Sequence, residues 1–157
     1  MPNENIALIR VDPLDPHTGL AFPNMALRIR DFMREHFSEG DPDTLTRQLL
    51  ARVALGDPTV FLLAMIDVKN AKVVGHLLCT LEQAGAKKWV YGWQAEVEGK
   101  QDDLLNKAFG LMEIWAGPEP KEFAMTTARS ERAWERKYGF KSLRHVMSRP
   151  IPYKEGD

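Results

Sequence analysis

Near its middle the chain changes its hydrophobic period from two residues to that of a helix within a few positions. From Lys88 to Glu98 apolar and polar side chains alternate, as in a β-strand with two different faces. From Gln101 the apolar residues recur at helical spacing until Gly117 and Pro118 interrupt the pattern. A strand that runs almost directly into an amphipathic helix favours a sheet covered by helices, and it constrains the fold more than any other feature.

The strand predicted at 88–98 has one aromatic face and one polar face. Its alternation places Trp89, Tyr91, Trp93, Ala95 and Val97 on the first face, and Val90, Gly92, Gln94, Glu96 and Glu98 on the second. Alternating aromatic residues on a central strand favour the core, so the first face is interpreted as buried, with ligand stacking as the alternative.

The first half of the chain predicts a strand, two helices and a hairpin. The strand spans 6–11 and is followed by a proline-rich loop that ends at Pro23. Asn24 is expected to cap the first helix, and Asp41 to cap a second helix that stops before Gly56. Two apolar runs at 59–67 and 72–81 then predict an antiparallel hairpin.

The last third predicts a strand at 122–128, a short helix from Ser130 to Lys137 and a final strand from Lys141 to Arg149. Antiparallel strands followed by alternating strands and helices indicate an α/β fold with a mixed, mostly antiparallel central sheet and helices on both faces. The length of 157 residues fits a single domain, 1–157.

Composition argues against several classes of protein. The 21 basic and 22 acidic residues give a net charge of -1, so no overall field attracts nucleic acid or an anionic membrane. Cys79 is the single cysteine and is interpreted as a buried, inert thiol. The four histidines lack paired spacing, so no metal site is expected. Without a leader-like start or a membrane-spanning run, a cytoplasmic location is expected.

The run Ala133-Trp134-Glu135-Arg136-Lys137-Tyr138-Gly139-Phe140-Lys141 resembles the penultimate helix and turn of the GNAT superfamily of N-acyltransferases. Val74-Gly75-His76 resembles its third strand, and the element order extends the resemblance over nearly the whole chain. Within the superfamily, the sequence most resembles small phage-encoded GNAT-like proteins. The resemblance implies acetyl-coenzyme A as co-substrate, bound where the fourth strand diverges from the fifth.

The resemblance also implies that the pyrophosphate of acetyl-coenzyme A binds to backbone NH groups at the start of the third helix, where the helix dipole favours an anion. The cofactor-binding candidates are therefore Val97, Gly99, Lys100, Gln101, Asp102 and Arg129. Family members usually carry Arg or Gln, two residues, Gly, any residue, and Gly or Ala; this chain offers only Gly99. Asp102 and Asp103 compete with the pyrophosphate for the same donors, or they act simply as helix-capping residues.

Three residues are candidates for the chemistry of acyl transfer. Glu96 and Glu98 are the candidate general bases, because the acceptor amine must be deprotonated before it attacks, with plain solvent exposure as the alternative. The tyrosine acid common in the family is replaced by Glu135, or by Lys137 when counted from the cap at Ser130, so Tyr138 is the nearest substitute. His76 is interpreted as a core histidine.

Two functions follow from these features. The first is N-acetyl transfer from acetyl-coenzyme A to an amine-bearing small molecule or a protein. The second is a catalytically inactive GNAT-fold protein, phage-encoded in type, that acts by binding a host protein; a coenzyme A binder without turnover lies between the two. No nucleic acid, membrane or metal partner is expected. The sequence carries no serine-hydrolase elbow, P-loop or dinucleotide glycine motif. A serine hydrolase, an NTPase and a Rossmann-fold oxidoreductase are therefore disfavoured.

Overall fold

The computed structural model describes residues 5–37, 40–99, 102–120 and 122–125. The elements in chain order are β1 (Ile6–Arg10), η1 (Gly19–Ala21), α1 (Phe22–His36), α2 (Pro42–Ala54), β2 (Val60–Asp67), β3 (Lys72–Ala84), β4 (Lys87–Val97), α3 (Asp102–Ala116) and β5 (Phe123–Met125). The helix and strand predicted within 130–149 lie outside these residues.

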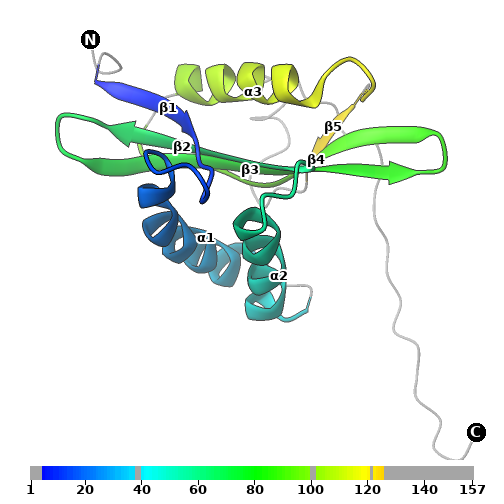
Figure 1. Cartoon of the computed structure of the whole chain (residues 1–157), viewed down its shortest axis with the longest axis horizontal. Helices are drawn as coiled ribbons and strands as arrows, with labels where there is room; N and C mark the ends of the chain where they lie inside the picture. The colour runs from blue at the N-terminus through cyan, green and yellow to red at the C-terminus, as the bar shows by residue number, and fades with distance from the viewer. Residues whose placement is uncertain (1–4, 38–39, 100–101, 121, 126–157) are drawn as a thin grey trace, which may run out of the picture.

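The strands form one five-stranded sheet in the order β1-β2-β3-β4-β5. Neighbouring strands are antiparallel except β4 and β5, which are parallel. Helices α1 and α2 lie on one face of the sheet and α3 lies on the other (Figure 1). The predicted mixed, mostly antiparallel sheet with helices on both faces is confirmed.

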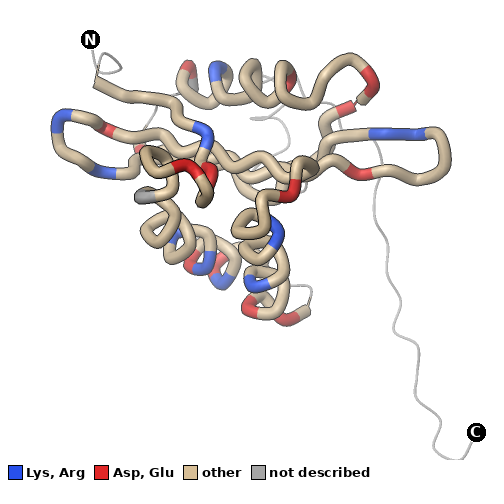
Figure 2. Tube along the Cα trace, in the orientation of Figure 1, with Lys and Arg blue, Asp and Glu red and all other residues tan. Residues whose placement is uncertain are grey.

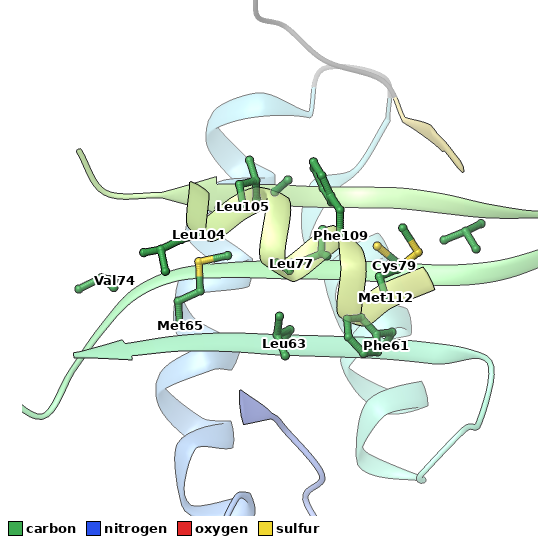
Figure 3. Packing of buried hydrophobic residues seen from close by; sticks show 13 residues of the cluster. Phe61, Leu63, Met65, Val74, Leu77, Cys79, Leu104, Leu105, Phe109 and Met112 are labelled. Carbon is green, nitrogen blue, oxygen red and sulfur yellow. The ribbon is translucent and has the colours of Figure 1, made fainter. Parts of the chain in front are cut away.

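Each face of the sheet has its own hydrophobic core. Beneath α3, four residues of this helix pack against β2 and β3 (Figure 3): Leu104, Leu105, Phe109 and Met112. On the opposite face, Met25, Ile29 and Met33 of α1 pack with Leu49 and Val53 of α2. Because β2 and β3 are covered on both sides, their sequences are continuous apolar runs rather than alternating ones.

Both predicted helix starts can be compared with the structure. Asp41 caps α2 as predicted, since its Oδ1 accepts a hydrogen bond from the Asp43 backbone N at 3.1 Å. The prediction for α1 is wrong: the helix begins at Phe22, and its N-cap is Ala21, three residues before the expected cap at Asn24. Pro23 is accepted in the first turn because the NH that it lacks has no partner there in any helix.

A β-bulge interrupts β4 at Trp93. Leu78 pairs with Gln94 while the next residue, Cys79, pairs with Gly92, so Trp93 is an extra residue in the register. The bulge reverses the alternation: Trp93 packs against the core beneath α1 and α2, whereas Ala95 belongs to the core beneath α3. The predicted common face for Trp93 and Ala95 is therefore wrong.

The three aromatic residues of β4 are also less buried than predicted. Trp89, Tyr91 and Trp93 are half-buried, so a part of each side chain reaches the surface. On the other edge of β4, Val90 to Gly92 pair with the three residues of β5.

Positive and negative residues are interspersed along the described chain (Figure 2), and none of its helices is long and apolar enough to cross a bilayer.

Candidate active site

Two of the predicted cofactor-binding residues, Val97 and Gly99, lie at the carboxyl end of β4 and in the turn that follows it. The strand ends at Val97, which packs against the core beneath α3, and the Glu98 backbone N donates to the Val74 carbonyl at 2.7 Å. Gly99 has φ 73°, a left-handed conformation that favours glycine. Helix α3 then begins at Asp102, so its unpaired NH groups and the positive end of its dipole lie directly after the strand.

Arg28 of α1 brings the two predicted bases into one ion-pair network. Its Nη2 lies 3.6 Å from Glu96 Oε1, and its Nη1 lies 3.7 Å from Glu98 Oε1. Lys72 Nζ lies 3.2 Å from Glu98 Oε2. Glu96, Glu98 and Gln94 thus share the face that meets α1, which confirms the prediction for this polar set. Glu98 is exposed and Glu96 is half-buried, so the alternative of solvent-facing glutamates stays open beside their ion pairs.

His76 links this network to a chain of hydrogen bonds inside the protein. Arg28 Nε donates to His76 Nδ1 at 3.0 Å, and because arginine has only donors, the proton of a neutral ring must be on Nε2. His76 Nε2 then donates to Gln94 Oε1 at 2.6 Å, and Gln94 Nε2 donates to the Ile29 carbonyl at 3.0 Å. The direction of every bond follows from the first.

Burial lowers the pKa of His76 to about 4, opposed by the hydrogen bond to Gln94 and assisted by the charge of Arg28. His76 is therefore neutral near pH 7, with both ring nitrogens hydrogen-bonded. The interpretation as a core histidine is confirmed. Cys79 is likewise fully buried, and burial raises the pKa of its thiol far above the usual value, which confirms its interpretation as a buried, unreactive group.

A second polar chain lies on the other side of the bulge, and sequence analysis missed it. Trp93 Nε1 donates to Thr80 Oγ1 at 2.9 Å, and Thr80 Oγ1 donates to Glu82 Oε1 at 2.7 Å. Glu82 was overlooked because the strand was expected to stop at Leu81, whereas β3 continues to Ala84. The only indication of Glu82 in the sequence was that it belongs to the polar residues that follow Leu81.

Gly75 allows the strands beside Glu96 to approach closely. A Cβ at this position would lie 2.6 Å from the Glu96 carbonyl oxygen and 2.7 Å from Met65 Sδ. Gly75→Ala is therefore expected to lower the free energy of unfolding by about 1–3 kcal/mol, because the backbone of β4 must move. Urea denaturation measures this change.

Gly110→Ala in α3 is the matched control, because an added Cβ there meets nothing within 4 Å. It is expected to be neutral or to stabilise the protein by up to about 1 kcal/mol, since alanine favours helix. Equal stability of the two variants would contradict the close approach at Gly75.

Several predicted site residues cannot be placed. Lys100, Gln101, Arg129 and Tyr138 lie outside the described residues, and for Asp102 the structure gives the backbone position only. Asp103 is exposed in the first turn of α3. Within the described ranges no group of three or more His, Cys, Asp or Glu side chains could hold a metal ion.

No protein-family model matches the sequence, and no curated protein matches it. Solved structures do match. An aminoglycoside 6'-N-acetyltransferase from Acinetobacter haemolyticus has a TM-score of 0.63 and 12% identity, covering 94% of this chain and 99% of that one. Glucosamine-6-phosphate N-acetyltransferase from Arabidopsis thaliana has a TM-score of 0.62 and 12% identity, covering 95% and 100%.

An aminoglycoside acetyltransferase from an uncultured soil metagenomic sample, solved in complex with sisomicin, has a TM-score of 0.58 and 14% identity, covering 98% of this chain and 99% of that one. At these identities the comparisons establish the architecture and leave the substrate open. The bulged β4, the β4–α3 junction and these similarities lead to one conclusion: the chain has the fold of the GNAT acetyltransferases.

Proposed function

We propose that the protein transfers the acetyl group of acetyl-coenzyme A to an amine. The observation that carries the proposal is the β4–α3 junction, where a helix N-terminus follows a glycine turn at the end of a bulged strand in a GNAT fold. Such a helix start offers backbone NH donors and a positive dipole to the pyrophosphate. Val97, Gly99, Lys100, Gln101, Asp102 and Arg129 remain the proposed contacts.

In the proposed reaction the amine nitrogen attacks the carbonyl carbon of the thioester. A C–N bond forms, the C–S bond breaks, and coenzyme A leaves as a thiolate that takes up a proton. The amine loses a proton to Glu96 or Glu98, directly or through water, and Tyr138 is the proposed proton donor to the thiolate. Arg28 forms ion pairs with both glutamates, and Lys72 forms one with Glu98, so both carboxylates are held at the end of β4.

The second candidate function is a GNAT-fold protein, phage-encoded in type, that binds a host protein without catalysis. The observation that favours it is the acidic first turn of α3, where Asp102 and Asp103 replace the residues that usually admit the pyrophosphate. Both candidates are proposed for the cytoplasm. They differ in whether the junction binds acetyl-coenzyme A.

Titration calorimetry with acetyl-coenzyme A tests the proposal. Replacing both carboxylates, in the variant Asp102→Asn with Asp103→Asn, is expected to strengthen binding about 3- to 30-fold at low salt. Each carboxylate near a helix N-terminus competes with the pyrophosphate for about 0.3–1 kcal/mol of dipole interaction. Asparagine keeps an oxygen that can cap the helix, so α3 should stay intact.

Glu113→Gln is the control, because it removes an exposed carboxylate from the last turns of the same helix. Its affinity for acetyl-coenzyme A should equal that of the unchanged protein. If the folded protein fails to bind acetyl-coenzyme A at millimolar concentration, with or without the aspartates, acetyl transfer is refuted and the protein-binding function takes its place.

A further inference from the structure

Strand β1 forms one edge of the sheet (Figure 1), because it is the first strand in the sheet order and β2 is its neighbour. Two hydrogen bonds show which of its backbone groups face β2. The backbone N of Val68 donates to the Asn5 carbonyl at 2.8 Å. At the other end, the backbone N of Val11 donates to the Leu62 carbonyl at 2.8 Å. Asn5 and Val11 therefore direct their backbone groups toward β2.

The backbone direction alternates along an antiparallel strand, and this decides which groups of β1 point outward. The register between β1 and β2 contains no bulge, so every second residue from Asn5 to Val11 faces β2. Ile6, Leu8 and Arg10 must then direct their N–H and C=O groups away from β2. Among the described residues, none donates to or accepts from these outward groups. The edge of β1 thus carries three donors and three acceptors that alternate along the strand.

β1 lacks the features by which edge strands usually prevent pairing with another chain. It consists of four apolar residues and a final arginine, without a proline, a lysine or a bulge. The four apolar side chains are only half-buried. Ile6 and Leu8 pack against the core beneath α3, so an added strand would continue this core. The edge is therefore suited to another apolar β-strand.

We propose that β1 pairs with β1 of a second copy of this chain, antiparallel, so that the two sheets join into one. The twofold axis passes beside Leu8. Leu8 then lies opposite Leu8 of the second copy, and Ile6 of each copy lies opposite Arg10 of the other. Each of these pairs exchanges two hydrogen bonds, so every outward group of both strands gains a partner. The inference is independent of the proposed acetyl transfer, because β2 and β3 separate β1 from the strand that leads to α3.

The charges along this edge favour a second copy as the occupant. Arg10 is exposed, and no ion pair among the described residues includes it; its cation lies 5.8 Å from the centroid of the Phe61 ring. Ile6 pairs with Asp67 of β2, whose carboxylate accepts hydrogen bonds from neutral groups of the β2–β3 turn. In the dimer, Arg10 of one copy lies in one row with Ile6 and Asp67 of the other, and all three project from the same face. The Cα atoms of Arg10 and Asp67 are then about 10 Å apart, two strand spacings, which an arginine side chain lying over Ile6 can span.

The proposed interface is small and symmetric. Because β1 has five residues, the buried area falls in the class of weak complexes below about 1,200 Å². We expect a dimer with a dissociation constant between about 10 μM and about 1 mM. Association should stop at two copies, because both copies use the same strand.

Sedimentation equilibrium of Arg10→Pro and Arg10→Ala tests the pairing. Both variants lose the same exposed side chain, but only proline also removes the N–H of residue 10. This N–H points away from β2, so the pairing within the chain is kept, as for prolines found on edge strands. Arg10→Pro is expected to dimerise about tenfold or more weakly than Arg10→Ala, because two of the shared hydrogen bonds are lost. Similar urea midpoints show that both variants are folded.

Amide hydrogen exchange of the unchanged protein, followed by NMR, tests the register without any substitution. Exchange of the Leu8 N–H should slow as the protein concentration rises from about 10 μM to about 1 mM. The N–H groups of Ala7 and Ile9 already face β2 and should exchange at a rate that does not depend on concentration. They are the internal control.

Four results overturn the proposal. The first is a protein that remains monomeric at about 1 mM, and the second is association that continues beyond two copies. The third is equal dimerisation of Arg10→Pro and Arg10→Ala. The fourth is exchange of the Leu8 N–H that does not change with concentration, because the edge then pairs with nothing or with a part of its own chain.

Discussion

Gln94→Met is expected to lower the free energy of unfolding by about 2–6 kcal/mol, although it places an apolar side chain of similar length in the core. Gln94 is 1% exposed, and it accepts from His76 Nε2 while it donates to the Ile29 carbonyl. Methionine satisfies neither group, and each buried group left without a partner costs about 1–3 kcal/mol. Urea denaturation monitored by circular dichroism measures the loss.

Gln48→Met on α2 is the control, because Gln48 is exposed and the same substitution there removes no buried partner. Its effect should stay within about 0.5 kcal/mol. A loss below about 1 kcal/mol for Gln94→Met would show that His76 and Ile29 find other partners, and the chain of hydrogen bonds would then have no structural role.

The elements that depend on local chemistry could be predicted from the sequence. Asp41 followed by Pro42 is a complete helix-start signal, and α2 begins there. The alternation from 88 onward predicted β4 because a period of two is a local property. A local signal can also be misleading. Asn24 is a good capping residue, yet α1 begins earlier and has Pro23 in its first turn.

The bulge at Trp93 could not be predicted, because a bulge is a mismatch between two strands. Within β4, Trp93 fits the alternation perfectly well, and only its partner strand reveals the extra residue. One extra residue exchanges the faces of everything beyond it, as any slip of one position does. The polar set of Gln94, Glu96 and Glu98 was grouped correctly because all three lie beyond the bulge.

Tertiary partners were out of reach for the same reason. Arg28 is 48 residues from His76 in the sequence, and nothing near Arg28 distinguishes it from a surface arginine of an amphipathic helix. Glu82 required both the true length of β3 and the bulge that brings Trp93 to Thr80. The candidate site is therefore visible in the sequence as a strand end and a helix start, but its side-chain contacts are not.

His76 should make the protein lose stability as the pH falls from about 6.5 to about 4. The folded-state pKa of about 4 lies below the ordinary histidine value of about 6.5, so in this window the unfolded chain binds a proton that the folded protein refuses. Stability therefore rises with pH here, with a limiting slope of about 1.4 kcal/mol per pH unit and a total of about 3 kcal/mol. Urea unfolding at a series of pH values measures the slope.

His76→Gln removes this titration and should flatten the curve between pH 6.5 and 4, whatever its cost in absolute stability. Carboxylates whose pKa is lowered by hydrogen bonds also stabilise the folded state less as the pH falls. The His76→Gln variant and the unchanged protein share these carboxylates, so they do not affect the comparison: Asp41, Asp43, Asp57, Asp67 and Glu119. His17→Gln, at an exposed histidine, should keep the slope of the unchanged protein. Parallel curves for the His76→Gln variant and the unchanged protein would mean that His76 takes up a proton in the folded state. Arg28 could then no longer donate to Nδ1, because both ring nitrogens would be donors, and the hydrogen bond between Arg28 and His76 would have to be abandoned.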